Sequence, residues 1–485
     1  MTAPSTPGGA GPAGTADPRR WKALAVCLIT GFMTLLDVSI VNVALPSIRD
    51  GLQADQSDLQ WVLSGYALTF GLILVPAGRF GDTHGQRNVF IAGVALFTAA
   101  SAAAGMAPNP AFLIAARLVQ GLAGGIINPQ VSGLIQRLFQ GAERGRAFGA
   151  LGATIGVSTA VGPLLGGLLI HLGGTEHGWR WIFYVNLPVG IAAIALAWHL
   201  IPEHCARGSG RRQTLDPLGV VLLGSALVLI LLPLVQERQW QGQRIWPLAL
   251  LGVAVLVAFL AWERRYARTG APLVDLTLFY RRSYGLGCLI ALLYFAGFTS
   301  IFFIFTLYLQ NGLGYSPLAA GAAITPFALG SAVSSALGGR RVTRYGRPLV
   351  VVGLVMVGLG LGATALVVDL VSPDHVTWAT VLPLLLAGTG SGLVISPNQT
   401  LTLSEVPLQR AGSAGGVLQT GQRIGAALGI AVVGTAFFTA LGVSNQWARA
   451  FDTALLVAIG FVLVALCAAL TDVIAGRRTR SSIDD

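Results

Sequence analysis

Two ionisable side chains lie inside long apolar runs of the sequence, where a charge is costly. Asp37 stands in TLLDVSIVNVALP and Arg117 stands in AARLVQGLAGG. A carboxylate within a membrane indicates a functional site, the alternative being a structural hydrogen-bond partner for backbone or arginine. Asp37 lies nine residues before Pro46 and Arg117 seven residues after Pro110, which is roughly 13 Å and roughly 10 Å of helix. These similar depths predict that the two side chains can form an ion pair.

A second arginine within an apolar run, Arg423, has no acidic partner in its half of the sequence. It bonds backbone carbonyl groups or lines a central cavity, and the sequence leaves both possibilities open. Aromatic residues elsewhere in the apolar runs could offer a surface to an amphipathic ligand, although most such residues simply pack. The candidate cavity residues are Trp61, Tyr66, Asn128, Tyr294, Phe298 and Arg423.

The stretch GVSTAVGPLLGGLL, residues 156–169, has the composition of a close helix contact. Gly costs roughly 1 kcal/mol and Pro roughly 3 kcal/mol relative to Ala in an ordinary helix interior. Within a membrane, glycines let a neighbouring helix approach closely, and proline removes a backbone hydrogen bond and kinks the helix. We expect such a contact at Gly156, Gly162, Pro163, Gly166 and Gly167.

The segment GRFGDTHGQR, residues 78–87, has the composition of a short turn between two helices. Its glycines allow the chain to reverse, and its aspartate can accept hydrogen bonds from a helix N-terminus or pair with a basic neighbour. A charged cytoplasmic loop is the simpler alternative, but it would not require glycine and aspartate at this spacing. The residues singled out are Gly78, Asp82, Gly85 and Arg87.

A polytopic membrane protein must position these residues. The 485-residue chain is 54% hydrophobic and 11% charged, against about 25% charged residues in soluble proteins. Basic loops on the cytoplasmic side explain the net charge of +11 without nucleic-acid binding. The single lysine, Lys22, follows Trp21, so no phosphate-binding P-loop is encoded. The four cysteines are scattered and predict neither a disulfide framework nor a metal site.

Hydropathy and helix breakers predict fourteen spanning helices, each long enough for a hydrocarbon layer of ~30 Å. With both termini inside, 24 of the 31 basic residues fall on the inside, five outside, and Arg117 and Arg423 within the membrane. This asymmetry follows the positive-inside rule and supports the helix count. The predicted helices are 21–46, 58–79, 88–107, 110–138, 146–171, 180–202, 216–235, 246–263, 284–310, 317–339, 348–369, 377–399, 411–441 and 452–475.

The two halves of the chain repeat. The segment 78–87 resembles GRRVTRYGRP at 339–348, and GATIG at 152–156 matches GQRIG at 421–425. Ordered matches at nearly constant spacing predict a duplicated bundle, with a substrate site at the interface of the halves. A third match pairs Gly124 and Pro129 with Gly392 and Pro397.

The repeat divides the chain into five predicted regions. Two six-helix bundles flank a linker that holds two further helices, and both tails are cytoplasmic. The regions are a disordered N-terminal tail 1–20, a bundle 21–202, the linker 203–283, a bundle 284–475 and a C-terminal tail 476–485.

The motifs, taken in order, resemble the major facilitator superfamily and within it the fourteen-helix drug:proton antiporters. The loop 78–87 resembles the family signature between helices 2 and 3, and departs from it at Thr83 and Gln86. The segment 36–48 is similar to the helix 1 motif, 117–125 to the helix 4 motif, and GVSTAVGPLLGG to the helix 5 motif of antiporters. WRWIFYVNLPVG, residues 179–190, also fits this subfamily, so that the resemblance spans residues 21–475.

The resemblance implies a major facilitator fold, all-α and polytopic, that performs proton-coupled antiport by alternating access in a bacterial cell membrane. Asp37 would carry the proton, Arg117 would favour its release, and the loop around Asp82 would lock the outward-facing state. The helix 5 motif would join that helix to the C-terminal half. The cargo would be amphipathic or cationic drugs, and the resemblance implies a monomer with neither enzymatic activity nor a cofactor.

Two other functions stay open at the level of sequence. One is a dedicated exporter of a single endogenous metabolite, such as a self-made antibiotic, peptide or lipid. The other is a channel or a membrane receptor that does not transport. Uphill efflux that a protonophore abolishes would separate the transporters from the channel, and a dye panel would separate the two kinds of exporter.

Overall fold

The structure, a computed structural model, describes residues 18–174, 177–202, 205, 216–236, 245–372 and 375–484. Helices make up nearly all of these residues, and the described part of the chain contains no β-strand. The all-α class predicted from hydropathy is therefore confirmed. Of the predicted N-terminal tail, only residues 18–20 lie among the described residues.

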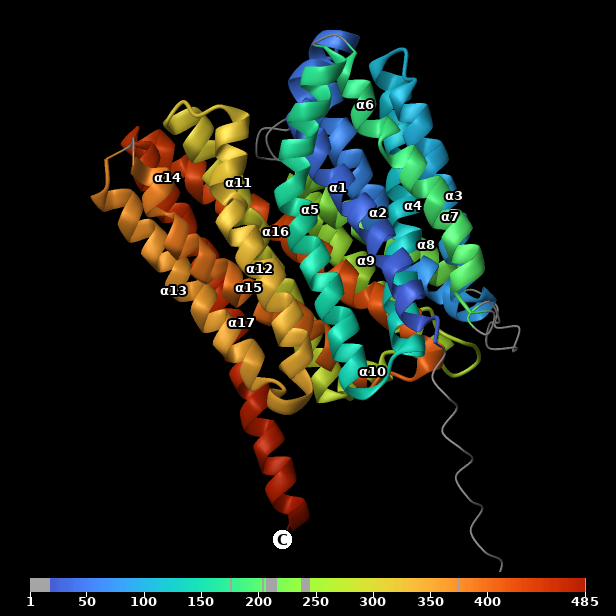
Figure 1. The fold of residues 1–485 in the computed structure, drawn as a ribbon. Helices are drawn as coiled ribbons and strands as arrows, with labels where there is room; N and C mark the ends of the chain where they lie inside the picture. Colours follow the sequence, from blue (N-terminus) through green and yellow to red (C-terminus); the bar gives the residue numbers. More distant parts are fainter. Residues whose placement is uncertain are drawn as a thin grey trace, which may run out of the picture.

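The first seven helices pack together as one bundle, shown from blue to green in Figure 1. Local signals fix several of their ends. Asp55 forms a capping box at the start of the second helix, and Asn109 caps the fourth, which has proline in its first turn. The helices are α1 Arg20–Leu52, α2 Gln56–His84, α3 Gln86–Gly105, α4 Pro110–Leu138, α5 Gly141–Gly173, α6 Gly178–Tyr184 and α7 Asn186–Leu200.

The last part of the chain forms a second bundle, shown from yellow to red in Figure 1. The predicted helix 284–310 ends in a short π-helical turn. The elements are α11 Arg282–Leu307, η2 Tyr308–Gly312, α12 Pro317–Tyr345, α13 Pro348–Leu370, α14 Val376–Ala379, α15 Val381–Ser404, η4 Leu408–Arg410, α16 Ala411–Ser444 and α17 Trp447–Asp484.

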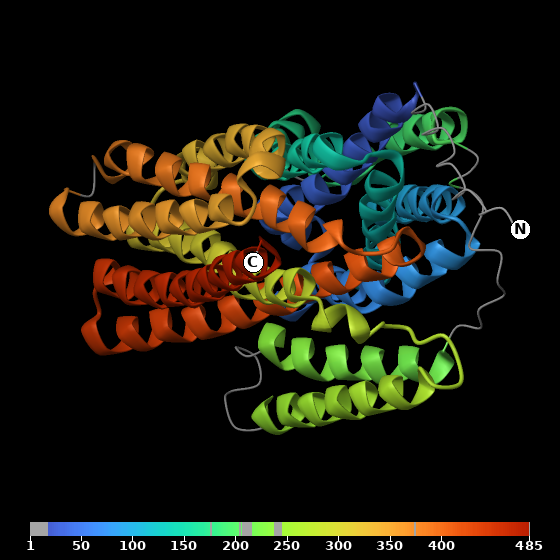
Figure 2. The same ribbon diagram turned by 90° about the horizontal axis from the view of Figure 1, so that it is seen from below.

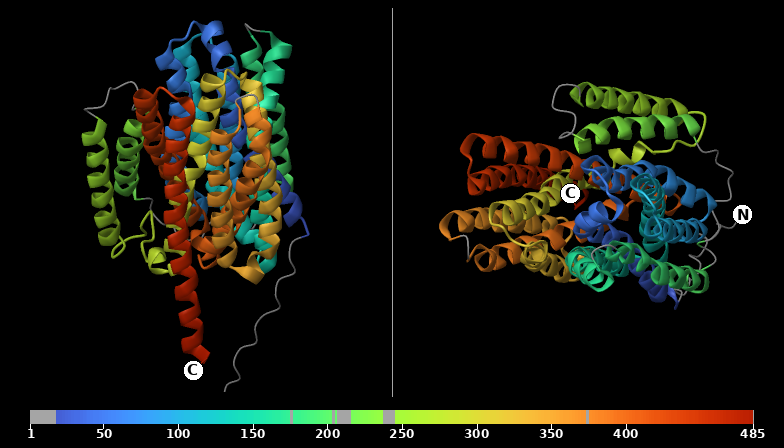
Figure 3. Two further views of the ribbon diagram at one scale, coloured as in Figure 1. Left: turned by 90° about the vertical axis from the view of Figure 1, so that its left-hand side faces the viewer. Right: turned by 90° about the horizontal axis from the view of Figure 1, so that it is seen from above.

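Two linker helices lie outside both bundles. They are α8 Pro217–Gln236 and α9 Ile245–Tyr266, followed by the short α10 Thr277–Tyr280. Figure 2 and the right-hand view of Figure 3 show α8 and α9 side by side at the edge of the molecule. They reach the N-terminal bundle through a small apolar cluster that joins Leu223 and Leu227 of α8 to Val75 of α2.

Thirteen helices among the described residues are long and apolar enough to cross a membrane, counting α6 and α7 as one span. The remaining predicted span, 216–235, is the apolar helix α8. Two expectations differ in detail. The predicted helix 180–202 is divided at Val185, and the last helix continues to Asp484 through most of the segment expected to be a tail.

We call the end of the molecule where α1 begins and α17 ends the proximal end, and the opposite end the distal end. Both helix termini lie toward the bottom of Figure 1, as an even number of crossings requires. The left-hand view of Figure 3 shows α17 extending beyond its neighbours at this end. The two bundles approach each other at the proximal end and diverge toward the distal end (Figure 1).

The two most extensive contacts between the bundles pair α2 with α16 and α5 with α12. The sequence repeat relates α2 to α12 and α5 to α16, so each seam joins a helix of one kind to the counterpart of the other. A two-fold relation between the halves requires this arrangement. Glycines permit it, because a Cβ at Gly78 would overlap the carbonyl oxygen of Gly412, and one at Gly339 that of Gly145. The predicted domain boundaries in the linker remain a prediction.

Candidate functional site

The two ionisable residues of the opening prediction are in direct contact. Asp37 projects from the middle of α1 and Arg117 from the first half of α4. Arg117 Nη1 donates to Asp37 Oδ2 at 2.5 Å, and each residue is only 1% exposed. The site is therefore an ion pair sealed inside the N-terminal bundle.

Three neutral side chains complete the site, and sequence reasoning did not identify them. Gln120 Nε2 donates to Asp37 Oδ1 at 2.9 Å, and Asn186 Nδ2 donates to the same oxygen at 3.1 Å. Both amides also reach Ser101 Oγ, at 3.2 and 3.0 Å. The spacing of Gln120, three residues after Arg117 on a helix, was a usable signal, since such residues share a face.

Further contacts hold Arg117 in place. Its Nε donates to the carbonyl oxygen of Val62 at 3.1 Å, and its Nη1 also donates to Gln120 Oε1 at 2.8 Å. The guanidinium lies over the ring of Tyr66, 4.3 Å from the centroid. A cation over an aromatic face is attracted by the ring quadrupole. Residues of α1, α2, α3, α4 and α7 thus converge on one charge pair.

Arg423 of α16 approaches this site from the other bundle. Its guanidinium lies over Phe70 of α2, 4.4 Å from the ring centroid, and Phe70 in turn lies 6.0 Å from the ring of Tyr66. Arg423 makes no hydrogen bond to a carbonyl group in the described part of the chain, so backbone bonding is not supported, and its place in a central cavity stays a prediction. Arg117 and Arg423 instead lie over two aromatic rings, Tyr66 and Phe70, on consecutive turns of α2.

The remaining candidate cavity residues fall into separate groups. Tyr294 and Phe298 of α11 stack at 5.6 Å and join an aromatic cluster with Phe327 of α12. The carbonyl oxygen of Asn128 accepts from Gln419 Nε2 at 3.4 Å, across the α4–α16 contact. Trp61 lies near the distal start of α2. A shared role for these residues around one ligand stays a prediction.

The glycine-rich stretch of α5 faces two different partners. Gly156 packs on Ala328 and Ala332 of α12, as the resemblance led us to expect, and Pro163 touches Gly321 of the same helix. The expectation that the whole motif joins the C-terminal half is wrong. A Cβ at Gly162 would overlap Ser39, and one at Gly166 would press on Ile40, so these two glycines face α1.

Gly167 departs from the expectation altogether, because a Cβ there would meet nothing within 4 Å. Adjacent helical residues point about 100° apart, so two neighbouring glycines cannot both face one helix. Beside these glycines, Ser39 Oγ of α1 donates a hydrogen bond to the carbonyl oxygen of Ser158 of α5, at 3.3 Å.

The 78–87 segment joins the bundles at the proximal end. Asp82 Oδ1 accepts from the backbone N–H of Gly412, and Oδ2 from that of Ser413, each at 2.9 Å. These N–H groups belong to the first turn of α16, where they have no partner within the helix. Of the two roles expected for Asp82, the structure has the acceptor at a helix N-terminus. We call this contact the proximal latch.

The other residues of the segment shape the turn. Gly85 has a φ of 97°, which other residues rarely adopt. Arg87 Nη2 donates to the carbonyl oxygen of Trp198 and lies 5.3 Å from its ring centroid, so this arginine ties α3 to the end of α7. Gln86, where the sequence departs from the family pattern, donates to Asp82 Oδ1 at 3.3 Å.

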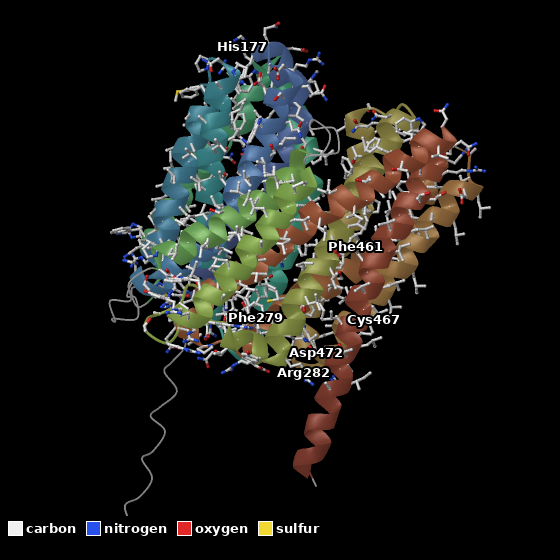
Figure 4. The ribbon with its side chains drawn as sticks, turned by 180° about the vertical axis from the view of Figure 1, so that it is seen from behind. His177, Phe279, Arg282, Phe461, Cys467 and Asp472 are labelled. Carbon is white, nitrogen blue, oxygen red and sulfur yellow. The ribbon has the colours of Figure 1, made fainter. Side chains whose placement is uncertain are left out.

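The corresponding region of the C-terminal bundle holds a buried acid that the candidate residues did not include. Asp472 of α17 is 2% exposed and pairs with Arg347 at 2.5 Å and with Arg282 at 3.0 Å. Figure 4 shows Arg282 and Asp472 together near the proximal end. Arg347 also donates to Asn398 Oδ1 at 2.5 Å. This cluster ties α11, α13, α15 and α17 within one bundle, whereas the proximal latch crosses between bundles.

Comparison with known proteins gives concordant results. A family model described as Major Facilitator Superfamily matches residues 27–430. The "Probable actinorhodin transporter" of Streptomyces coelicolor is 39% identical, over 90% of this chain and 76% of that protein. The "Puromycin resistance protein pur8" of Streptomyces alboniger is 38% identical, over 86% and 82%. The "Tetracenomycin C resistance and export protein" of Streptomyces glaucescens is 32% identical, over 89% and 79%.

Solved structures share the fold at low sequence identity. The human organic anion transporter MFSD10 superposes with a TM-score of 0.68 at 16% identity, covering 93% of this chain and all of that one. The proton:xylose symporter XylE gives a TM-score of 0.65 at 14% identity, over 94% and 95%.

Proposed function

The chain belongs to the major facilitator superfamily, and on that premise we propose that it is a proton-coupled antiporter that exports amphipathic or cationic antibiotics. Its family makes it a multi-pass membrane transporter and not an enzyme. We place it in a bacterial cell membrane as a monomer, with the proximal end cytoplasmic. The excess of arginine in the predicted inner loops supports that orientation.

The buried ion pair carries this proposal. The carboxylate of Asp37 is held by Arg117, Gln120 and Asn186 in the interior of the N-terminal bundle. A charge in this position is costly, and an ordinary structural contact would not need one. A carboxyl group is suited to the role because it can gain and lose a proton.

Protonation of Asp37 would change the packing around it. Arg117 would keep Val62, Gln120 and the ring of Tyr66 but would lose its counter-charge. Removing one partner of a buried ion pair costs about 3–5 kcal/mol. A conformation of the N-terminal bundle that admits water to Arg117, or that brings an anionic group to it, would then become more favourable. We infer that proton uptake loosens α1 from α4.

A continuous set of contacts leads from Asp37 to the other bundle. Ser39, two residues along α1, bonds the backbone of α5 and packs against Gly162. On its opposite side α5 packs against α12 through Gly145, Gly149 and Gly156. A shift of α1 would therefore press on the helix that forms one of the two seams. We propose that this route couples proton uptake to rocking of the bundles.

The proximal latch supports an outward-facing assignment for this conformation. Asp82 caps α16 across the seam, and Gln136 Nε2 donates to the carbonyl oxygen of Ala411 at 3.3 Å beside it. Opening toward the cytoplasm must break these hydrogen bonds. Alternating access would then exchange a closed proximal end for a closed distal end.

The energetics of this exchange are adequate for export. One proton moving through 100 mV supplies roughly 2.3 kcal/mol. Since about 1.4 kcal/mol corresponds to a factor of ten, coupling of one proton to one neutral substrate supports roughly fifty-fold accumulation.

The cargo follows from the relatives and not from the site. Three of them carry names of single antibiotics: actinorhodin, puromycin and tetracenomycin C. Another, 35% identical, is named multidrug resistance protein Stp, from Mycobacterium tuberculosis. The single-antibiotic names favour a second candidate function, which is dedicated export of one endogenous antibiotic.

Everted membrane vesicles from cells that express the full chain test both candidates. With an acidic lumen, we expect puromycin or ethidium to accumulate inside and a protonophore to release it. Accumulation of both compounds supports a multidrug antiporter, and accumulation of one antibiotic without the dye supports a dedicated exporter. Uptake that persists after the gradient has collapsed would refute proton coupling.

A further inference from the structure

A groove on the outer surface of the N-terminal bundle is not part of the site described above. It lies between α1 and α7 and has a volume of about 330 Å³. Val26 and Ala193 are buried and form its floor, whereas Ile29 and Leu196 are 44% and 41% exposed. Every lining residue is apolar. The groove arises because alanines on α7 are too short to fill the space beside α1.

The dimensions of the groove match one hydrocarbon chain. It runs along α7 from Pro188 to Leu196, which is about 12 Å of helix. One leaflet contributes about 15 Å of hydrocarbon, half of a ~30 Å core. The lining on α1 lies six to nine residues after Arg20 at the proximal end, so the groove opens to the leaflet on that side.

A positive charge marks the headgroup end of the groove. Lys22, the single lysine of the chain, is exposed on α1. It precedes Val26 by four residues and Ile29 by seven, which places all three on one face of the helix. His199 on α7 has the same relation to Leu196 and Ala192, at intervals of three and seven. Long basic side chains at a helix end reach the level of lipid phosphates.

We propose that the α1–α7 groove binds one acyl chain of an anionic phospholipid from the proximal leaflet, with Lys22 at its phosphate. This proposal does not depend on the direction of transport or on the substrate. The two helices that form the groove also carry Asp37 and Asn186. Because an acyl chain would wedge between them, occupancy of the groove would influence the relative position of two partners in the buried site.

Native mass spectrometry of the purified full chain tests the proposal, with dioleoyl phosphatidylglycerol and dioleoyl phosphatidylcholine as probes. A basic residue near an anionic lipid is worth about 1 kcal/mol, or about five-fold in affinity. We therefore expect Lys22→Gln to lower the preference for phosphatidylglycerol about five-fold. Arg340→Gln, which removes an exposed charge from α12, should leave the preference unchanged.

Filling the groove provides an independent test. Ala192 lines the groove, and Ala195, one turn away on α7, is also exposed but does not line it. We expect Ala192→Phe to abolish retention of either lipid and Ala195→Phe to retain both. Equal retention by the two phenylalanine variants, or an unchanged preference in Lys22→Gln, would overturn the proposal. Loss of ethidium binding alone in Ala192→Phe would assign the groove to substrate instead.

Discussion

At the scale of single residues, the proposed proton coupling depends on how completely the carboxylate of Asp37 is hydrogen-bonded. Its two oxygens accept from Arg117, Gln120 and Asn186, and no side chain of this set is more than 2% exposed. Buried polar groups are costly unless they are paired. The carboxylate is therefore fully paired, and a change at any partner leaves one of its oxygens with fewer hydrogen bonds.

Asn186→Leu tests the contribution of a neutral partner. This change removes one hydrogen bond to Asp37 and one to Ser101. We expect a loss of about 1–3 kcal/mol in the free energy of unfolding, with weakened efflux, measured by thermal unfolding and by dye export. Asn42→Leu is the matched control, since Asn42 is exposed and bonds only within α1. Equal losses in both variants would remove Asn186 from the site.

At the scale of helices, one glycine motif serves two contacts. Gly156 faces α12, Gly162 and Gly166 face α1, and Gly167 faces open space. The motif therefore holds α5 between the helix that carries Asp37 and the helix that forms a seam. The effect of a bulky substitution should therefore depend on which helix the glycine faces, and not on its membership of the motif.

Leucine substitutions along α5 test these directions. Gly156→Leu and Gly162→Leu introduce overlap with backbone or with Ser39, and overpacking costs typically about 1–3 kcal/mol. We expect both variants to insert in the membrane but to lose most efflux, measured by immunoblot and dye export. Gly167→Leu should transport like the parent chain. Inactivity of Gly167→Leu would show that the motif acts through something other than these contacts.

The proximal latch is also a contact between elements. Asp82 caps α16 from the other bundle, whereas the repeat places Thr343 at the equivalent position of the second seam. The second seam has glycine contacts but lacks this carboxylate. The carboxylate cap therefore strengthens the α2–α16 seam and has no counterpart at position 343 of the other seam. Its loss should favour opening at the proximal end.

Asp82→Asn tests the latch directly. Asparagine keeps one acceptor oxygen for α16 but loses the second hydrogen bond and the negative charge at the helix N-terminus. Together these are worth about 1–2 kcal/mol, which is a factor of about 5–30 in a conformational equilibrium. Spin labels at the exposed Phe80 and Leu408 would report the separation of the bundles. We expect a longer distance to gain population in Asp82→Asn but not in Thr83→Ala, whose hydroxyl bonds only α2 and His84. An unchanged distance distribution would contradict the latch.

At the scale of the whole molecule, the sequence predicted the fold well because hydropathy and arginine placement are collective signals. An apolar run of about twenty residues, or an excess of arginine on one side of the membrane, is still recognisable when single positions are misassigned. The repeat likewise predicted a duplicated bundle, and the seams observed in the structure follow the two-fold relation between its halves. The division at Val185 and the extension of α17 depend on local packing, which composition does not specify.

The site could be predicted only where a residue was unusual for its surroundings. Asp37 and Arg117 stood out as charges in apolar runs, whereas Gln120, Asn186 and Ser101 are neutral residues that many helices contain. Their convergence depends on helix rotation and on contacts between residues as far apart as Asp37 and Asn186. The contact of Gly162 with α1 and the pairing of Asp472 with Arg347 depend on helix rotation in the same way.

The central claim is that proton movement through Asp37 drives export, and transport into everted vesicles tests it most directly. Puromycin and ethidium uptake would be measured with an imposed acidic lumen, in the parent chain and in Asp37→Asn at equal expression. Asp50→Asn, at the exposed distal end of the same helix, is the control. We expect gradient-dependent uptake in the parent and in Asp50→Asn, and none in Asp37→Asn. Parental uptake by Asp37→Asn would contradict this claim.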